Sequence, residues 1–322
     1  IAQAFNRVVS GGLGFLFARG LAILVQFVSV PITSAYLDSK SFAIWIFITT
    51  LVSICTLFDI GLGSSIVNIS ARTSEREGFA RVISQSLTNL CLTFFPAFFF
   101  ALLGIGFIYG SFSTDMGMNV FKEKNLMLSA SVYLIIAIAH TPLVSALQSA
   151  MGCGKPVYVY CAQGVGSTLF LLSVVWAAES ELSIIALVGV SYGSITLIHL
   201  ICYLLFVFKY KSNSIGFDWQ MARELFRNAK YFWILQLGVM IQVSVGALIV
   251  AEFLELEKVP QYTLSQKLFS ITGVVLSAFL NMLWPTLAAM RGTNKIEELR
   301  VFLGMASTLC LTFSIGSAIL LY

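Results

Sequence analysis

Charged residues are scarce in this sequence. Asp, Glu, Lys and Arg together make up 11% of the 322 residues, whereas hydrophobic residues make up 58%. A soluble domain carries about 25% charged residues, because it must cover its surface with polar groups. The composition therefore excludes an ordinary soluble domain and predicts a membrane protein with several spans.

The short motifs of catalysis are also absent. The sequence has no phosphate-binding GxxxxGK loop, no HExxH zinc motif and no closely spaced pair of aspartates for a metal-bound nucleotide sugar. Histidine occurs twice, at His140 and His199, in apolar segments far apart in the sequence. We favour a hydrogen-bonded packing role for each histidine, with a proton relay as the alternative. We expect no enzyme activity.

The six cysteines have no CxxC spacing and lie mostly in apolar segments. This pattern predicts small buried side chains rather than disulfides or metal ligands, so we expect no metal site. They are Cys55, Cys91, Cys153, Cys161, Cys202 and Cys310.

Nine apolar stretches are long enough to cross a bilayer, which requires about 20 residues of helix. Backbone groups in lipid must be hydrogen-bonded internally, and these runs do not alternate as barrel strands do. We therefore predict an all-α polytopic membrane protein with nine visible transmembrane helices. The stretches are 12–33, 41–66, 83–110, 126–150, 158–177, 184–208, 230–251, 262–288 and 299–321. Since the sequence starts at Ile1 and stops within an apolar run, we expect further residues at both ends, mainly the C-terminal one.

Lysines and arginines are unevenly divided between the two sides of this topology. If the N-terminus is cytoplasmic, the outer side holds only Lys40, Lys122, Lys124 and Lys258, and most other cations fall on the cytoplasmic side. The positive-inside rule then predicts a multi-pass protein with a cytoplasmic N-terminus.

A short amphipathic segment, 216–229, separates the sixth and seventh apolar stretches. Trp219, Leu225 and Phe226 fall on one helical face, whereas Arg223 lies elsewhere. This pattern predicts an interfacial helix on the cytoplasmic leaflet that links two halves.

A weak internal repeat supports the division into halves. Ala35-Tyr-Leu-Asp38 after the first stretch resembles Glu252-Phe-Leu-Glu255 after the seventh. An even number of helices between the copies gives the halves a parallel orientation. We therefore predict an N-terminal six-helix bundle at 1–215, the linker at 216–229, and the first three helices of a C-terminal bundle at 230–322.

Asp59 stands alone in an apolar stretch and is followed by glycines at 61 and 63. A carboxylate at the centre of a membrane helix costs about 2.5 to 3.5 kcal/mol on insertion scales, so it usually has a partner or a task. A structural partnership with Arg19 or a cap at a glycine-softened helix end is one interpretation. The other is that the Arg19–Asp59 pair lines a cavity.

Two cations, Arg19 and Lys267, are also expected inside the membrane, and each has a structural and a functional interpretation. Arg19 and Asp59 are each expected about six residues, or roughly 10 Å, from the cytoplasmic ends of their helices, which would let them pair. Lys267 follows Gln266 near the outer end of the eighth stretch. Each cation either extends to the headgroups or faces a central cavity suited to an anionic headgroup.

Polar residues recur in the first, second, seventh and eighth stretches. Any single one is best interpreted as a hydrogen bond between helices, but together they predict a wet interior between the halves. They are Gln26, Asn68, Gln236, Gln242, Gln266 and Asn281. In the internal repeat, Gln236 takes the place of Arg19.

Several of these segments resemble one family. The Phe-Asp-Ile-Gly-Leu-Gly segment at 58–63 is similar to the aspartate-glycine motif of polysaccharide flippases. The Tyr-Thr-Leu-Ser-Gln-Lys-Leu segment at 262–268 and Leu-Trp-Pro at 283–285 resemble the start and end of a flippase helix. The chain most resembles O-antigen flippases of the Wzx type, in the multidrug/oligosaccharidyl-lipid/polysaccharide exporter (MOP) superfamily.

The resemblance implies twelve helices in two six-helix bundles around a central cavity, in a bacterial inner membrane. Such proteins move an undecaprenyl-diphosphate-linked oligosaccharide, an O-antigen or similar repeat unit, to the periplasmic leaflet by alternating access. We expect a monomer, because each chain would enclose its own pathway. Its expected partners are membrane lipids, a glycan polymerase and a chain-length regulator, with no nucleic acid. The resemblance implies no cofactor and leaves the coupling ion, H⁺ or Na⁺, open.

Mapped onto this chain, the resemblance makes Arg19 and Lys267 the cavity cations, with Asp59 in the motif position. Gln26, Gln236 and Gln266 complete the expected substrate-binding cavity. Two alternatives remain: a cation-coupled multidrug exporter, which would favour acidic and aromatic cavity residues, and a glycan polymerase or ligase, which would need large outer loops.

Overall fold

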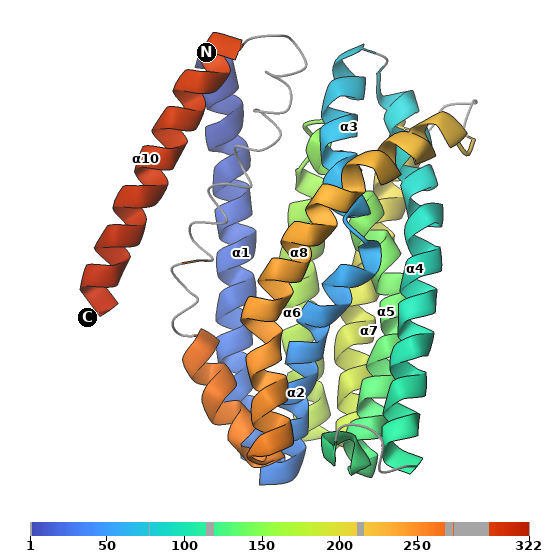
Figure 1. Cartoon of the computed structure of the whole chain (residues 1–322), viewed down its shortest axis with the longest axis vertical. Helices are drawn as coiled ribbons and strands as arrows, with labels where there is room; N and C mark the ends of the chain where they lie inside the picture. The colour runs from blue at the N-terminus through green and yellow to red at the C-terminus, as the bar shows by residue number, and fades with distance from the viewer. Residues whose placement is uncertain are drawn as a thin grey trace.

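The computed structural model describes residues 2–76, 78–113, 119–210, 216–267, 273 and 296–321. Within these ranges, regular secondary structure consists only of helices, most of them long and roughly upright side by side (Figure 1). The chain is therefore all-helical where it is described, in agreement with the sequence.

The helices follow one another in the order expected from the apolar stretches. The first part contains α1 (Ala2–Tyr36), α2 (Ser39–Cys55), η1 (Thr56–Asp59), α3 (Leu62–Arg76), α4 (Phe79–Ser113), η2 (Asn119–Lys122), α5 (Lys124–Gly152), α6 (Val157–Glu179) and α7 (Ile184–Tyr210). The second contains α8 (Trp219–Phe253), η3 (Leu256–Lys258), a helix described over 259–267, and α10 (Ile296–Leu321).

Length and composition identify the segments that are able to cross a membrane. Among the described residues there are 5, namely Ser39–Asp59, α4, α5, α6 and α7, and α8 makes a sixth if its two parts, bent by 40°, count as one span. A multi-pass membrane protein is thus supported. Nine spans and two six-helix bundles stay predictions, and most of the stretch predicted at 262–288, with Asn281, lies outside the described residues.

The stretch predicted as one helix over 41–66 is broken in the middle. After η1, Ile60 adopts φ 47° and Gly61 φ 80°, both left-handed, and α3 then continues to Arg76. Glycine adopts such a φ without steric cost. A side chain at Gly61 would also collide with the backbone oxygen of Ala229 on α8. The break therefore lets α8 pass close to the chain.

The linker predicted at 216–229 is not a separate helix. Its helical residues are the first turns of α8, which runs from Trp219 to Phe253. Asp218 caps this start by accepting the N–H of Met221 at 3.1 Å. No glycine or proline occurs from Trp219 to Leu237, so nothing in the sequence ends the helix there. The three-part division at 1–215, 216–229 and 230–322 stays a prediction.

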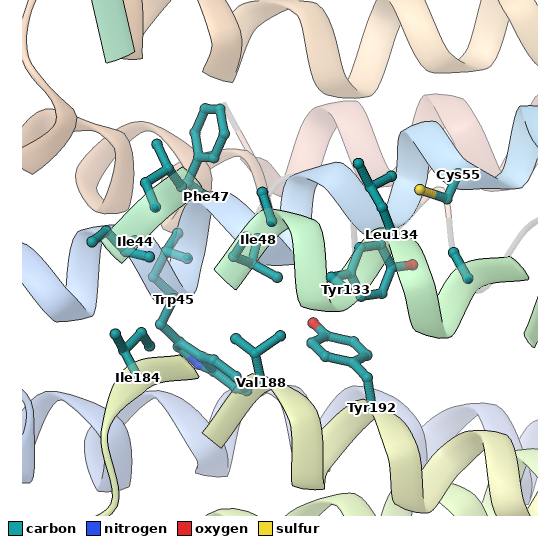
Figure 2. Packing of buried hydrophobic residues seen from close by; sticks show 14 of the residues in the cluster. Ile44, Trp45, Phe47, Ile48, Cys55, Tyr133, Leu134, Ile184, Val188 and Tyr192 are labelled. Atoms are coloured by element: carbon teal, nitrogen blue, oxygen red, sulfur yellow. The ribbon is translucent and has the colours of Figure 1, made fainter. Parts of the chain in front are cut away.

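The largest apolar core joins α2 to α5, α6 and α7, and Figure 2 shows its residues on α2, α5 and α7. Trp45 is 1% exposed and stacks on Phe170, with ring centroids 5.8 Å apart. Tyr133 meets Tyr192 edge to face at 4.8 Å. Because lipid is as apolar as this core, tight packing rather than water exclusion holds the helices together. The core fixes α2 up to the point where it breaks.

Ionic contacts attach the start of α8 to the helices before it. Arg72 on α3 contacts Glu224 at 3.1 Å, and Arg81 on α4 contacts Asp218 at 2.6 Å. Ser65 on α3 also donates to the backbone oxygen of Leu225 at 3.2 Å. These contacts hold the first turns of α8 against α3 and α4.

Candidate functional site: a polar cavity at the helix break

A cavity of about 300 Å³ lies beside the break between α2 and α3. α5, α6 and α8 complete its walls. Polar side chains make up much of the lining: Thr56, Asp59, Ser64, Tyr133, His140, Thr141, Ser145, Gln148, Gln163 and Gln236. So many polar groups inside an apolar bundle are characteristic of a substrate or ion pathway.

The carboxylate of Asp59 is held by three hydrogen bonds. Oδ1 accepts the N–H of Gly61 at 2.9 Å and the side-chain amide of Gln236 at 3.1 Å. Oδ2 accepts the N–H of Gly63 at 3.1 Å. The first N–H groups of a helix lack helical partners and carry partial positive charge, which suits a carboxylate. Asp59 thus satisfies the start of α3, and the geometry supports the cap interpretation.

Glycine at position 63 keeps α3 and α5 close together beside this carboxylate. A Cβ at Gly63 would lie 2.6 Å from Asp59 Oδ2 and 3.1 Å from Ser145 Oγ. The position of Ser145 is fixed by a hydrogen bond, because Asn89 Nδ2 on α4 donates to its hydroxyl at 3.0 Å. The second glycine of the motif therefore makes room for the cap.

Two amide oxygens of the lining are buried without a hydrogen-bond partner among the described residues. They are Oε1 of Gln163 on α6 and Oε1 of Gln236 on α8. A buried acceptor without a partner costs about 1 to 3 kcal/mol, so such groups usually bind water or a ligand. The cavity can therefore bind water or a polar ligand between α6 and α8.

The two histidines, far apart in the sequence, meet at this cavity. His140 on α5 lines it, and the ring of His199 on α7 packs against His140 with centroids 4.9 Å apart. Both rings also have hydrogen bonds at Nδ1. The packing role predicted for each histidine thus has direct support, and the contact between them is new information.

Lys267 and Gln266 lie away from the cavity, where the 259–267 helix meets earlier helices. Lys267 Nζ is 3.5 Å from the hydroxyl of Thr49 on α2, and the lysine is partly buried. Gln266 donates to the backbone oxygen of Gln242 on α8 at 3.4 Å. These residues join the second part of the chain to α2 and α8.

Arg19 and Gln26 lie on α1, seven positions apart and hence on the same helical face. The Gln26 side chain is exposed, whereas that of Arg19 falls outside the described side chains. The Arg19–Asp59 pair therefore stays a prediction. Both residues lie farther from the helix ends than expected, because α1 begins at Ala2 and α3 extends to Arg76, and their depth in the membrane stays a prediction.

Of the residues predicted to line one cavity, Asp59 and Gln236 both line it and are joined by a hydrogen bond. The sequence interpretation missed the polar face of α5, which carries Thr141, Ser145 and Gln148. Their spacing at i, i+4 and i+7 places them on one side of a helix. That periodicity, in an otherwise apolar stretch, was the signal available in the sequence.

Two curated relatives of the chain are named as O-antigen transporters. One, named "Putative O-antigen transporter", from Salmonella typhimurium, is 21% identical over 315 residues, which cover 92% of this chain and 69% of that protein. A second, of the same name from Salmonella typhi, is 21% identical and is covered over 62% of its length. The chain thus spans about two thirds of these relatives. No model of a known protein family matches it.

Solved structures with the same fold are transporters too. A MOP superfamily transporter of Pyrococcus furiosus gives a TM-score of 0.78 at 14% identity, over 96% of this chain and 70% of that one. A MATE transporter of Vibrio cholerae gives 0.79 at 14% identity, over 100% and 74%. These likenesses establish the fold. The relatives and fold neighbours are transporters, not enzymes.

Proposed function

We propose that this chain is an O-antigen-flippase-type transporter of the MOP superfamily, and that it moves a lipid-linked oligosaccharide across the bacterial inner membrane. The proposal takes the substrate class from the curated relatives and the architecture from the fold neighbours. The observation that carries it on this chain is the polar cavity at the helix break, where Asp59 and Gln236 join α3 to α8.

The chemistry of the cargo explains why such a cavity is needed. An undecaprenyl diphosphate carries charged and heavily hydroxylated groups that cannot cross about 30 Å of hydrocarbon unaided. A protein can replace their hydration with hydroxyl, amide and cationic side chains while the lipid tail stays in the bilayer. The side-chain oxygens of Gln163 and Gln236 are suited to sugar hydroxyls, because an amide oxygen accepts a hydrogen bond from a hydroxyl group.

The diphosphate would require cations, and the two candidates are Arg19 on α1 and Lys267 on the 259–267 helix. Lys267 is partly buried beside Thr49 of α2, so its charge has less water around it than a surface lysine. A charge in such surroundings attracts an anion more strongly. In the proposal, Lys267 and Arg19 bind the diphosphate, and Gln26 and Gln266 flank them.

Alternating access would use the interruptions already present in the helices. The Asp59–Gly61 break and the 40° bend of α8 are places where backbone direction changes over a few residues. Transporters of several folds place such broken helices at their binding sites. The N-terminus would be cytoplasmic, and the chain would act as a monomer alongside a glycan polymerase and a chain-length regulator.

Complementation tests this function. A bacterial strain without its own O-unit flippase receives the full-length gene, Lys267→Ala, Arg19→Ala or the control Lys258→Ala, whose lysine is exposed. We expect surface glycan with the wild type and the control, and little or none with Lys267→Ala and Arg19→Ala at equal protein level. Wild-type glycan from both variants would contradict the cation assignment.

Complementation also distinguishes a flippase from the two alternative functions. Failure of well-expressed wild type to restore glycan, together with increased drug resistance, would favour a cation-coupled multidrug exporter. Single repeat units accumulating on the outer leaflet of a strain that lacks only this gene would favour the polymerase or ligase.

A further inference from the structure

The contact between His140 and His199 is more than close packing of two rings. The centroids are 4.9 Å apart and the ring planes meet at 75°. His199 is 7% exposed, and His140 lines the cavity that contains Asp59. Two titratable rings therefore share one buried position, with access to a polar cavity on one side.

The hydrogen bond of His199 fixes where its proton is. Its Nδ1 lies 2.9 Å from the backbone oxygen of Ile195. A carbonyl oxygen only accepts hydrogen bonds, so Nδ1 must carry the hydrogen. In the neutral ring, Nε2 then holds a lone pair and is the basic nitrogen.

The hydrogen bonds of Thr196 determine the tautomer of His140 in the same way. The Thr196 hydroxyl lies 2.9 Å from the backbone oxygen of Tyr192, to which it donates its single hydrogen. It also lies 3.2 Å from His140 Nδ1, where it can then only accept. His140 Nδ1 thus carries a hydrogen, and Nε2 is again the basic nitrogen. Among the described residues, no hydrogen bond reaches either Nε2.

We infer that His140 and His199 form a binding site for a single proton, which enters from the cavity lined by Asp59. Both basic nitrogens are available, so either ring can take the first proton. A second proton would place two positive rings side by side away from water, and like charges at this distance strongly disfavour that state.

Burial away from water opposes the charge of even the first proton, and the cavity offers one acidic group that can offset it. Asp59 is the one carboxylate among the described lining residues of the cavity, and no lysine or arginine is among them. The charged side chains of α4 to α7 lie towards the helix ends, at Arg81, Lys124, Glu179 and Lys209. The titratable side chains in the central parts of the surrounding helices are thiols and phenols, which are uncharged near neutral pH. They are Cys55, Cys91, Tyr133, Cys161, Tyr192, Cys202 and Tyr203. Arg72 on α3 is engaged with Glu224.

The site bears on the coupling ion that the sequence left open between H⁺ and Na⁺. Imidazole nitrogens bind protons, whereas hard cations prefer oxygen ligands. The histidine pair is therefore a site for H⁺. Its use in coupling rests on the proposed transport function, but proton binding itself does not.

Nuclear magnetic resonance of ring-¹⁵N-labelled histidine tests the site directly. The full chain is reconstituted in lipid nanodiscs and titrated from about pH 8 to about pH 4, a range that spans ordinary histidine titration. His140→Gln and His199→Gln assign the signals. Thr196→Val, which removes the acceptor at His140 Nδ1, serves as a matched control for the tautomer.

We expect both rings to be neutral with hydrogen on Nδ1 at high pH. The pair should then bind one proton, with the second step lower by more than about one pH unit, that is, more than tenfold weaker. Either single His→Gln variant should bind its one proton without that second step. Thr196→Val should alter the tautomer of His140 and leave that of His199 unchanged.

Three results would overturn the inference: two rings that titrate independently at one midpoint, rings that take up no proton in this range, or hydrogen on Nε2 at high pH. None of these depends on transport. A proton site that titrates as expected, in a protein that fails to restore surface glycan, would refute the proposed function and leave the site in place.

Discussion

Gln236 on α8 donates its side-chain amide to the carboxylate of Asp59, 3.1 Å away, across the break between α2 and α3. The same carboxylate accepts the N–H groups of Gly61 and Gly63. One acidic side chain therefore caps a broken helix and joins it to the first helix of the second part of the chain. Three predictions concern this junction, and all are measured on the purified protein in detergent or nanodiscs.

Removing the buried cap at Asp59 should destabilise the protein more than removing a comparable cap at its surface. Asp59→Ala removes three hydrogen bonds and leaves two buried N–H groups without partners, so we expect a loss of about 2 to 4 kcal/mol. Asp38→Ala is the matched control, because Asp38 caps α2 by accepting the N–H of Ser41 at an exposed position. It should cost about 1 kcal/mol or less. Equal losses in thermal unfolding would contradict the buried cap.

A second carboxylate at the junction should make stability depend on pH. In Gln236→Glu, two carboxyl groups would meet where one amide hydrogen bond exists now. They can share a proton at low pH, whereas at high pH both ionise and repel each other. The variant should therefore unfold at a lower temperature than the wild type, and the difference should grow as pH rises. Gln236→Leu, which lacks the added charge, should show a difference that is nearly independent of pH.

The close passage of α8 should make alanine intolerable at the break. Gly61 has φ 80°, and a Cβ there would meet the Ala229 oxygen and the Trp233 nitrogen, which are backbone atoms that cannot rotate away. We expect Gly61→Ala to cost at least about 2 kcal/mol, from the left-handed conformation and the collision together. Gly20→Ala, in α1 with open space around it, should instead be neutral or stabilise by up to about 1 kcal/mol. A neutral Gly61→Ala would mean that α8 lies farther away.

Much of this arrangement could be predicted from the sequence, because composition and apolar run length determine which segments are membrane helices. The aspartate-glycine motif also marked the place where the chain is unusual, and the cap was one of the interpretations it allowed. The break itself was missed. The residues around it, Phe58, Ile60 and Leu62, are as apolar as those of a continuous span, and hydropathy does not report backbone dihedrals.

The rest could not be predicted because it depends on which helices are neighbours. His140 and His199 meet only because α5 packs against α7. Asp59 and Gln236 were both assigned to a polar interior, but their direct hydrogen bond depends on the close passage of α8 at Gly61. Short-range patterns identify the polar faces of helices and leave their partners undetermined.

The ion pairs at the start of α8 carry a mechanical consequence. Arg72–Glu224 and Arg81–Asp218 fasten the first turns of α8 to α3 and α4, and Gln236 fastens its middle to Asp59. The first half of this helix, up to Gln236, is thus bonded to the N-terminal helices, although the sequence assigns it to the linker and to the next half. If the halves rock against each other, the hinge is then the 40° bend of α8 near residue 243. It lies inside a helix instead of in the connection between α7 and α8.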